Sequence, residues 1–171
     1  MEKQTRRPSF CSALLAFLAC PTVVGYGIPL YLLSVDAPPG RGSVAGWALL
    51  ALGSAALLAC VRDFYVVGKG TLAPWAPPTR LVVVGLYRHV RNPMYLAVLT
   101  LVGGFASLGG SVRILAYLVV LALIFEARVR WGEEPRLAES FGQDWVSYKG
   151  AVRRWWPRWK PWVGAQGQTA H

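Results

Sequence analysis

Four long apolar runs separated by short charged segments constrain the fold of this chain most strongly. They cover about residues 10–33, 43–61, 93–108 and 112–129. Hydrophobic residues make up 54% of the 171 positions and charged residues only 15%, which is too apolar for an ordinary soluble domain. The runs are long enough for membrane helices, although the third is near the lower limit of about 17 residues. We therefore predict an all-α, multi-pass transmembrane bundle of about four spans.

The two N-terminal runs predict how their helices bend and pack. The first contains Pro21 and Pro29, so we expect a kinked helix. It follows a short basic segment, but it is longer than a typical signal-peptide core, and we interpret it as a retained membrane helix. The second run has small residues at a four-residue spacing, Ala51, Ala55 and Ala59. That spacing predicts a face on which another helix approaches closely.

Local signals mark the ends of the last two apolar helices. Asn is a favoured N-cap and Pro fits the first helical position, so Asn92 and Pro93 predict where the third helix begins. The third run ends at Gly109-Gly110-Ser111, which is a turn signal. We therefore expect the last two spans to form a helical hairpin.

The distribution of basic residues predicts the orientation of the spans. The formal net charge is +10, and the charges lie between the apolar runs rather than on one amphipathic face. With a cytoplasmic N-terminus and four spans, 16 of the 18 Lys and Arg residues are cytoplasmic, and only Arg41 and Arg113 lie outside. This bias predicts a multi-pass protein with both termini cytoplasmic. Arginine far outnumbers lysine, and alanine, glycine and valine are common, which suggests a bacterial inner membrane. Membrane lipids are the expected partners, and nucleic acid is not.

Cysteine and histidine usage argues against a metal centre. Cys11, Cys20 and Cys60 lie inside apolar runs without a CxxC spacing, and the chain has only two histidines, His89 and His171. We interpret the cysteines as small buried side chains and expect no metal. The chain also lacks strand–helix alternation and a GxGxxG after a strand, which argues against a soluble nucleotide-binding fold.

The predicted topology places two polar clusters of opposite charge at the same cytoplasmic edge of the membrane. Arg88 and Arg91 precede the predicted N-terminus of the third helix, which itself favours an anion. Glu133 and Glu134 follow the fourth helix. The simplest interpretation is that the arginines reach lipid headgroups and the carboxylates are solvated. Carboxylates near an anionic leaflet need a cationic partner, however, and a ligand ammonium or sulfonium, or one of these arginines, would serve.

The two clusters resemble the signature of a known family. The pattern Gly85-x-Tyr87-Arg88-x-x-Arg91-Asn92-Pro93-x-Tyr95 resembles that of the isoprenylcysteine carboxyl methyltransferase family and the related phospholipid N-methyltransferases. The second half of the signature is similar to Glu133-Glu134-x-x-Leu137-x-x-x-Phe141-Gly142-x-x-Trp145-x-x-Tyr148, followed by Val152-Arg153 and Pro157. The resemblance covers about residues 68–160, and two motifs in the family's order make it specific.

The resemblance implies an integral membrane methyltransferase that uses S-adenosylmethionine without a Rossmann domain. Its acceptor would be lipophilic, with a carboxylate, amine or thiol on a lipid-like molecule. The active site would be cytoplasmic, with catalytic roles for Arg91, Glu133 and Glu134. The cofactor would be bordered by Tyr87, Arg88, Arg91, Asn92, Pro93, Tyr95, Glu133 and Glu134. The substrate would lie near Tyr148 and Arg153.

Two positions depart from the family pattern, and two other functions stay open. Better-known eukaryotic members have His-Pro where this chain has Asn92-Pro93, and a tyrosine is common where Trp145 stands. Asn does not titrate near neutral pH, so the first departure argues against proton transfer at that position. The alternatives are an NADPH-dependent membrane reductase acting on a sterol-like lipid and a non-enzymatic membrane protein whose motifs only anchor it.

The C-terminal part of the chain is rich in tryptophan and arginine. Six of the eight tryptophans follow position 130, interleaved with basic side chains, which is typical of anchoring at the membrane interface. We expect a cytoplasmic, helical C-terminal segment. The predicted organisation is one integral membrane domain over residues 1–163, with its catalytic region at about 68–160, followed by a disordered tail at 164–171.

Overall fold

The regular structure of the chain is helical. The computed structural model describes residues 21–36, 43–67 and 81–164. In chain order the elements are the π-helical turn η1 (Val23–Gly27), α2 (Ile28–Val35), α3 (Val44–Val67), the 3-10 turn η2 (Gly85–Arg88), α4 (Pro93–Gly109), α5 (Val112–Arg128), the π-helical turn η3 (Val129–Glu133) and α6 (Glu134–Ala151). No strand occurs in these ranges, which confirms the all-α prediction for the described residues.

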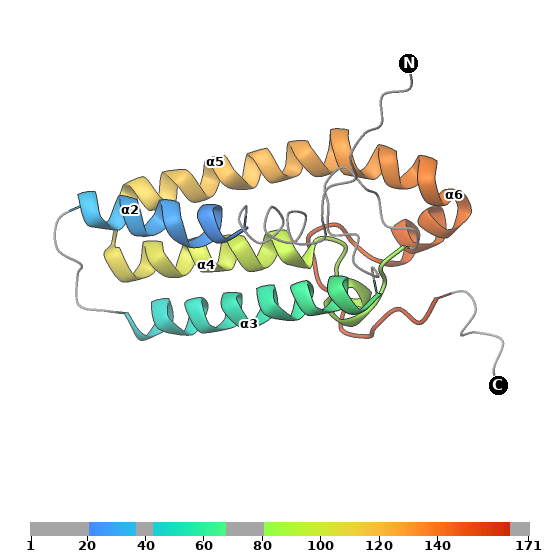
Figure 1. Ribbon diagram of the computed structural model, residues 1–171, viewed down its shortest axis with the longest axis horizontal. Helices are drawn as coiled ribbons and strands as arrows, with labels where there is room; N and C mark the ends of the chain where they lie inside the picture. The colour runs from blue at the N-terminus through green and yellow to red at the C-terminus, as the bar shows by residue number, and fades with distance from the viewer. Residues whose placement is uncertain (1–20, 37–42, 68–80, 165–171) are drawn as a thin grey trace, which may run out of the picture.

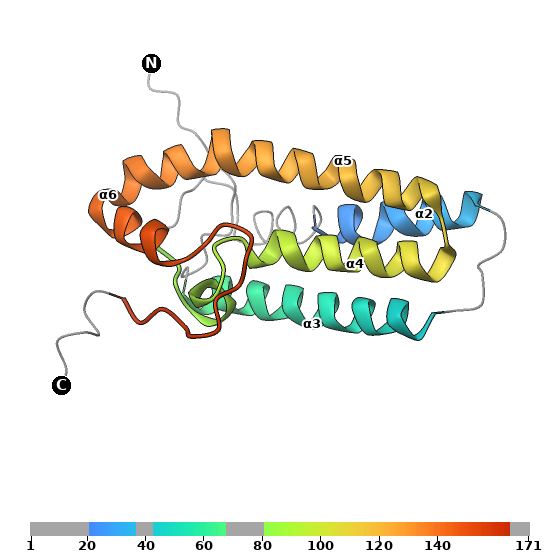
Figure 2. The ribbon, with the colours of Figure 1, turned by 180° about the vertical axis from the view of Figure 1, so that it is seen from behind.

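The helices α2 to α5 lie side by side along the longest axis of the molecule, and α6 turns across one end (Figure 1). The view from behind shows the same arrangement, with α4 between α3 and α5 (Figure 2). Leu101 and Val102 of α4 are fully buried, and they belong to one apolar cluster with Ile114 and Phe125 of α5. The core of the bundle therefore lies around α4.

Glycines allow α3 and α4 to approach each other closely. A Cβ added at Gly53 of α3 would lie 2.9 Å from the backbone nitrogen of Leu101 in α4. A Cβ at Gly104 of α4 would lie 3.0 Å from the backbone nitrogen of Leu50 in α3. The prediction that Ala51, Ala55 and Ala59 form the packing face is wrong. Ala51 and Ala55 are exposed, and a different side of α3 faces α4. The spacing alone does not say which side of the helix meets its neighbour.

The predicted hairpin of the last two apolar helices is confirmed as a structure. Gly110 adopts a left-handed conformation with φ of 59° and ends α4, as expected for a C-terminal glycine. The Ser111 hydroxyl accepts a hydrogen bond from the Ile114 N–H at 3.2 Å and caps α5. At this end of the bundle Asp36 accepts hydrogen bonds from Ser111 and Arg113, so the end of α2 is held to the start of α5.

The first apolar run deviates from a regular helix near its second proline. The π-helical turn η1 precedes α2, and the N–H of Ile28 bonds to the carbonyl of Val23, five residues earlier. Pro29 follows directly after this turn. The chain is already helical from residue 21, so the N–H that Pro29 lacks leaves a carbonyl of the preceding turn without a helical donor. This irregularity agrees with the predicted distortion. Residues 10–20 of the run lie outside the described residues.

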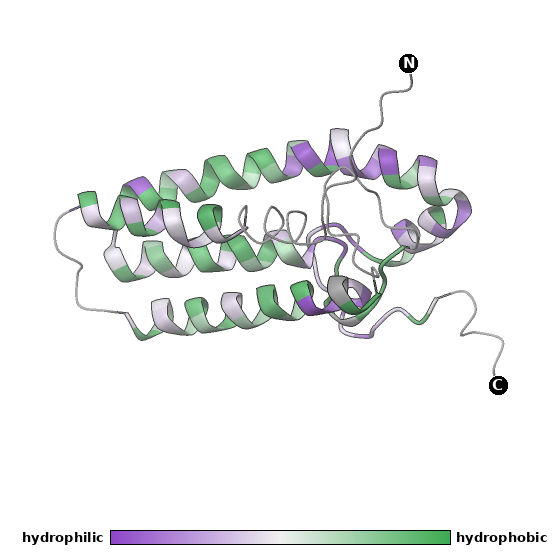
Figure 3. Ribbon diagram, in the orientation of Figure 1, coloured by the Kyte–Doolittle hydropathy of each residue, from purple (hydrophilic) through white to green (hydrophobic). Residues whose placement is uncertain are grey.

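Among the described residues, α3 contains the helical segment that is long and apolar enough to cross a membrane, over Val44–Asp63. The helix itself continues about one turn further, to Val67. The segments Val23–Val35 and Pro93–Gly109 are apolar but shorter. Hydrophobic residues follow most of the length of the bundle, whereas hydrophilic residues gather where α5 meets α6 (Figure 3). Leu58 of α3 and Leu123 of α5 are among the large apolar side chains that face outward.

The C-terminal part is helical only as far as Ala151. Beyond it, residues 152–164 form a non-helical segment, here named the strap, which corrects the prediction of a helical Trp/Arg-rich segment over its second half. Pro157 and Pro161 lie in the strap, and neither supplies the N–H that a continued helix needs. The predicted disordered tail falls mainly on residues 165–171, outside the described residues.

Candidate active site

The loop before α4 and the strap after α6 run alongside each other, although they are about sixty residues apart in sequence. The Arg91 N–H donates to the Arg153 carbonyl at 3.0 Å. The Arg158 N–H donates to the His89 carbonyl at 2.9 Å, and the Trp162 N–H donates to the Arg88 carbonyl, also at 2.9 Å. These backbone bonds hold the first sequence motif against the end of the second.

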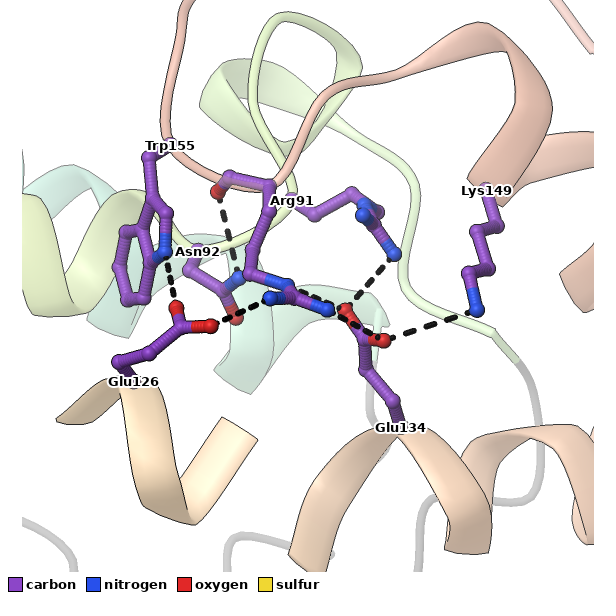
Figure 4. A network of polar contacts seen from close by, with 7 residues as sticks. Arg91, Asn92, Glu126, Glu134, Lys149 and Trp155 are labelled. Carbon is purple, nitrogen blue, oxygen red and sulfur yellow. Dashed lines mark hydrogen bonds and ion pairs between the residues drawn. The ribbon is translucent and has the colours of Figure 1, made fainter. Parts of the chain in front are cut away.

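Glu134 lies at the centre of the polar network that forms there (Figure 4). Its Oε1 accepts from Arg91 Nη1 at 2.9 Å and from Arg154 Nε at 2.8 Å. Its Oε2 accepts from Arg154 Nη2 at 2.9 Å, and Lys149 Nζ lies 3.7 Å away. The residue is only 7% exposed. Burial raises the pKa of this carboxyl, but the hydrogen bonds from Arg154 and the charge of Arg91 outweigh it and lower the pKa. The group is therefore ionised at neutral pH.

Arg91 is the buried cation opposite Glu134. Its side chain is 9% exposed, and its guanidinium carbon lies 5.5 Å from the centre of the Trp145 ring, within the range of a cation–π contact. Burial lowers the pKa of Arg91, and the charge of Glu134 counteracts this effect. The Nε atom is buried without a hydrogen-bond partner among the described residues. Such a donor is costly to leave unpaired, and because it has almost no exposed surface, a ligand acceptor would reach it only if neighbouring groups moved.

Glu133 points into a second, more exposed part of the site. Its Oε1 accepts hydrogen bonds from the Tyr95 hydroxyl and, at 3.0 Å, from Arg128 Nε. Arg128 Nε also donates to the Tyr95 oxygen at 3.0 Å. The Glu133 side chain is 34% exposed, and its Oε2 accepts none of the hydrogen bonds made by the described residues. The two adjacent carboxylates therefore have different environments, because both residues are helical and successive side chains of a helix point about 100° apart.

Three residues that the sequence analysis did not single out, Glu126, Arg154 and Trp155, join α5 to the strap. Glu126 Oε1 accepts from Arg154 Nη1 at 2.6 Å, and Glu126 Oε2 accepts from Trp155 Nε1 at 2.6 Å. Arg153, which was predicted to lie near the substrate, is exposed, and its neighbour Arg154 is the strap arginine in the polar network. The Arg153-Arg154 pair was visible in the sequence. Only the backbone path of the strap decides which of the two faces inward.

Asn92 and Pro93 take the predicted positions at the start of α4, but Asn92 does not cap the helix with its side chain. Its Nδ2 donates instead to the Arg154 carbonyl at 3.2 Å. Pro93 is buried at the first helical position. This pair therefore positions the strap as well as the helix, through the backbone of Arg154.

Three other predicted residues lie beside the network rather than in it. Tyr87 is buried in a separate cluster with Cys60 and Val82, and its carbonyl accepts from the Tyr148 hydroxyl at 2.6 Å. Burial raises the pKa of Tyr148, so this hydroxyl stays protonated and donating. Arg88 Nε donates to the Trp162 carbonyl at 2.7 Å and lines a separate cavity of about 250 Å³. The hydrogen bond between Tyr148 and Tyr87 therefore joins the loop before α4 to α6 and helps to fix the position of both.

No group of three or more His, Cys, Asp or Glu side chains that could hold a metal ion occurs within the described residues. The site instead consists of carboxylates, guanidiniums and aromatic rings at one end of an apolar helical bundle. Such an arrangement is suited to holding a small molecule that carries both charges. The described part of the chain is thus a helical protein whose polar site lies at one end of an apolar bundle.

Comparison with known protein families identifies the family of the chain. The model of the phospholipid methyltransferase family matches residues 42–144, which is more than half of the chain and includes α3, α4, α5, Arg91, Glu133 and Glu134. The chain therefore belongs to the phospholipid methyltransferase family, which confirms the resemblance seen in its motifs. No curated protein and no solved structure matched. Family membership implies a methyltransferase associated with membranes.

Proposed function

We propose that this protein is an integral membrane methyltransferase that uses S-adenosylmethionine and acts on a lipophilic acceptor. The observation that carries the proposal is the ion pair between Arg91 and Glu134, at 2.9 Å. It brings the two family motifs together at the polar end of an apolar bundle. Membership in the phospholipid methyltransferase family supports the reaction class.

The proposed topology is multi-pass, with the site facing the cytoplasm of a bacterium. The positive-inside bias supports this orientation. The helices α4 and α5 have 17 residues each, or about 25 Å at the usual helical rise, which is slightly less than the hydrocarbon core of a bilayer. Their hairpin would therefore end near the far surface, and the exposed apolar side chains of α3 and α5 would face lipid.

The residues of the site fit the proposed cofactor. S-adenosylmethionine supplies a methyl group on a sulfonium that is already activated toward nucleophilic displacement. Glu133 and Glu134 provide the negative charge that suits its cationic end, and the unpartnered Nε of Arg91 suits its carboxylate. Tyr95 and Trp155, whose ring centroids lie 6.5 Å apart, provide aromatic surface. The protein's contribution is then positioning and electrostatic complementarity.

Glu133 is the proposed proton acceptor if the substrate is an amine. An amine must be neutral to attack the methyl group, and a carboxylate near it can take the proton. Glu133 is suited to this role because it is half-buried and its Oε2 makes no hydrogen bond with the described residues, whereas both oxygens of Glu134 are bound. A carboxylate acceptor would need no base. A lipophilic tail would approach laterally from the bilayer, along the exposed apolar faces of the bundle.

Direct binding measurements test the cofactor class. The purified full chain in detergent should bind S-adenosylmethionine and should not bind NADPH, which the alternative reductase requires. Arg91→Ala removes both the buried cation and the unpartnered Nε, so we expect its affinity for S-adenosylmethionine to fall about a hundredfold. Isothermal titration calorimetry measures both ligands. Arg136→Ala is the matched control, because Arg136 is exposed on α6 and makes no ion pair with the described residues.

Absence of S-adenosylmethionine binding by the wild type would rule out the proposed function. Tight binding of NADPH would favour the reductase, and binding of neither ligand would favour a non-enzymatic role. Equal affinity of the wild type and Arg91→Ala would leave the reaction class but remove Arg91 from the site.

A further inference from the structure

Glu126 is bound at both oxygens by the strap and, among the described residues, by nothing else. Arg154 Nη1 donates to Oε1 and Trp155 Nε1 donates to Oε2, each at 2.6 Å. The side chain projects from α5, next to the buried Phe125 and a run of exposed apolar residues. The Glu126 side chain is 37% exposed, and beside an apolar helix face a carboxylate favours a cationic partner. The strap supplies this partner, and Glu126 in turn fixes the position of the strap.

Arg154 connects this contact to the centre of the site. Its three guanidinium nitrogens are all used: Nη1 on Glu126, and Nε and Nη2 on Glu134. One side chain therefore bridges α5 and α6 and covers both oxygens of the central carboxylate. Trp155 contacts Tyr95 from the same stretch of strap. Glu126, Arg154 and Trp155 together are named the latch.

The closed latch opposes the binding of a further cation at Glu134. Arg91, Arg154 and Lys149 all lie within 4 Å of this carboxylate. Glu126 shares Arg154 with it, and the neighbouring Glu133 is paired with Arg128. The cations therefore outnumber the anions, and a sulfonium placed there would meet net repulsion. If Arg154 moves away, the repulsion falls, and both oxygens of Glu134 become accessible from the strap side.

The strap is also anchored at both of its ends. Val152 is fully buried, and the Trp162 ring packs against Tyr148 with the two centroids 5.4 Å apart. Three backbone hydrogen bonds join the strap to the loop before α4, and side chains of that loop donate to two strap carbonyls. Between these anchors several strap side chains are exposed, and Trp159 is 99% exposed. The latch therefore holds the middle of the strap, where Arg154 and Trp155 lie.

We propose that Glu126 is a positioning residue and that the latch holds the strap closed, with Arg154 occupying the place of the ligand cation beside Glu134. The latch must open before the cofactor binds. This inference rests on the proposed function for its ligand, but the latch itself does not. The apparent cofactor affinity is then the intrinsic affinity multiplied by the fraction of molecules whose latch is open. Weakening the latch should tighten binding, which is the opposite of what loss of a binding residue does.

Glu126→Gln tests the latch in the full chain. It removes the charge paired with Arg154 but keeps an amide oxygen that can accept from Trp155. Without ligand, amide hydrogen exchange measured by mass spectrometry should become faster in residues 152–164 and stay unchanged in α4. With ligand, the dissociation constant for S-adenosylmethionine should fall several-fold, up to about tenfold. Trp155→Phe removes one hydrogen bond and should produce a smaller change of the same sign.

Glu139→Gln is the matched control, because Glu139 is exposed on α6 and makes no ion pair with the described residues. It should alter neither exchange nor affinity. Unchanged strap exchange in Glu126→Gln would overturn the latch. Faster exchange with equal or weaker cofactor binding would overturn its gating role. A wild type that binds no S-adenosylmethionine would instead refute the proposed function, while the ligand-free exchange would still decide whether the latch exists.

Discussion

Glu134→Ala should both destabilise the protein and abolish detectable binding of S-adenosylmethionine. The substitution leaves Arg91 buried without its counter-ion, and removing one partner of a buried ion pair costs about 3–5 kcal/mol. It also frees Arg154 and Lys149 from the carboxylate that holds them. The unfolding midpoint in detergent, followed by circular dichroism, should fall by several degrees, and titration calorimetry should show no cofactor binding.

Two further substitutions separate charge from packing at this position. Glu134→Gln keeps the size of the side chain and a hydrogen-bond acceptor for Arg91, so it should lose less stability than the alanine variant. Because it lacks the negative charge, its affinity for the cofactor should still be much lower than that of the wild type. Glu139→Ala, on the exposed face of the same helix, should behave as the wild type in both measurements. An unfolding midpoint of Glu134→Ala equal to that of the wild type would show that the buried pair does not contribute as described.

Gly53→Ala should destabilise the bundle, whereas Gly103→Ala should not. A Cβ at Gly53 would lie 2.9 Å from the Leu101 nitrogen and 3.0 Å from the Ala97 oxygen, and neither backbone atom can move without shifting α4. Overpacking of this kind costs about 1–3 kcal/mol. At Gly103 the added methyl meets nothing within 4 Å, so helix propensity should stabilise this variant by about 0.5–1 kcal/mol.

Thermal unfolding of both variants in the same detergent compares these effects directly. The two substitutions make the same chemical change in neighbouring apolar helices, so an effect of detergent or of helix propensity alone would move both midpoints in the same direction. A decrease for Gly53→Ala with an increase or no change for Gly103→Ala is the expected pattern. The same midpoint shift for both would contradict the close approach of α3 and α4.

The sequence predicted those features that follow from local rules or from charge on one side of the bundle. Asn92 and Pro93 mark the start of α4, and Gly110 ends it, because caps and turns depend on a few adjacent residues. The meeting of Arg91 with Glu134 followed from the topology, which places both clusters at one edge. The sequence therefore predicts that the two clusters meet, but it does not predict their individual contacts.

The features that the sequence did not predict depend on tertiary contacts, which leave no periodic pattern in the sequence. Arg154 rather than Arg153 enters the site because the strap leaves the helix at Ala151 and follows an irregular path. Glu126 belongs to the site because that path passes over α5. Gly53 rather than Ala51 meets α4 because helix rotation is set by the whole core. In each case the sequence offered adjacent candidates, and only packing distinguished them.

The most direct test of the account is transfer of a labelled methyl group to a lipid-soluble product. Membranes containing the wild-type protein, incubated with S-adenosylmethionine that carries a deuterated methyl group, should yield an organic-phase product heavier by one labelled methyl, as detected by mass spectrometry. Membranes containing Arg91→Ala or Glu134→Ala at equal abundance should yield none. Labelled product from the wild type alone is the predicted result. Equal labelling with all three proteins, or none with the wild type while it binds the cofactor, would contradict the assignment of this site to methyl transfer.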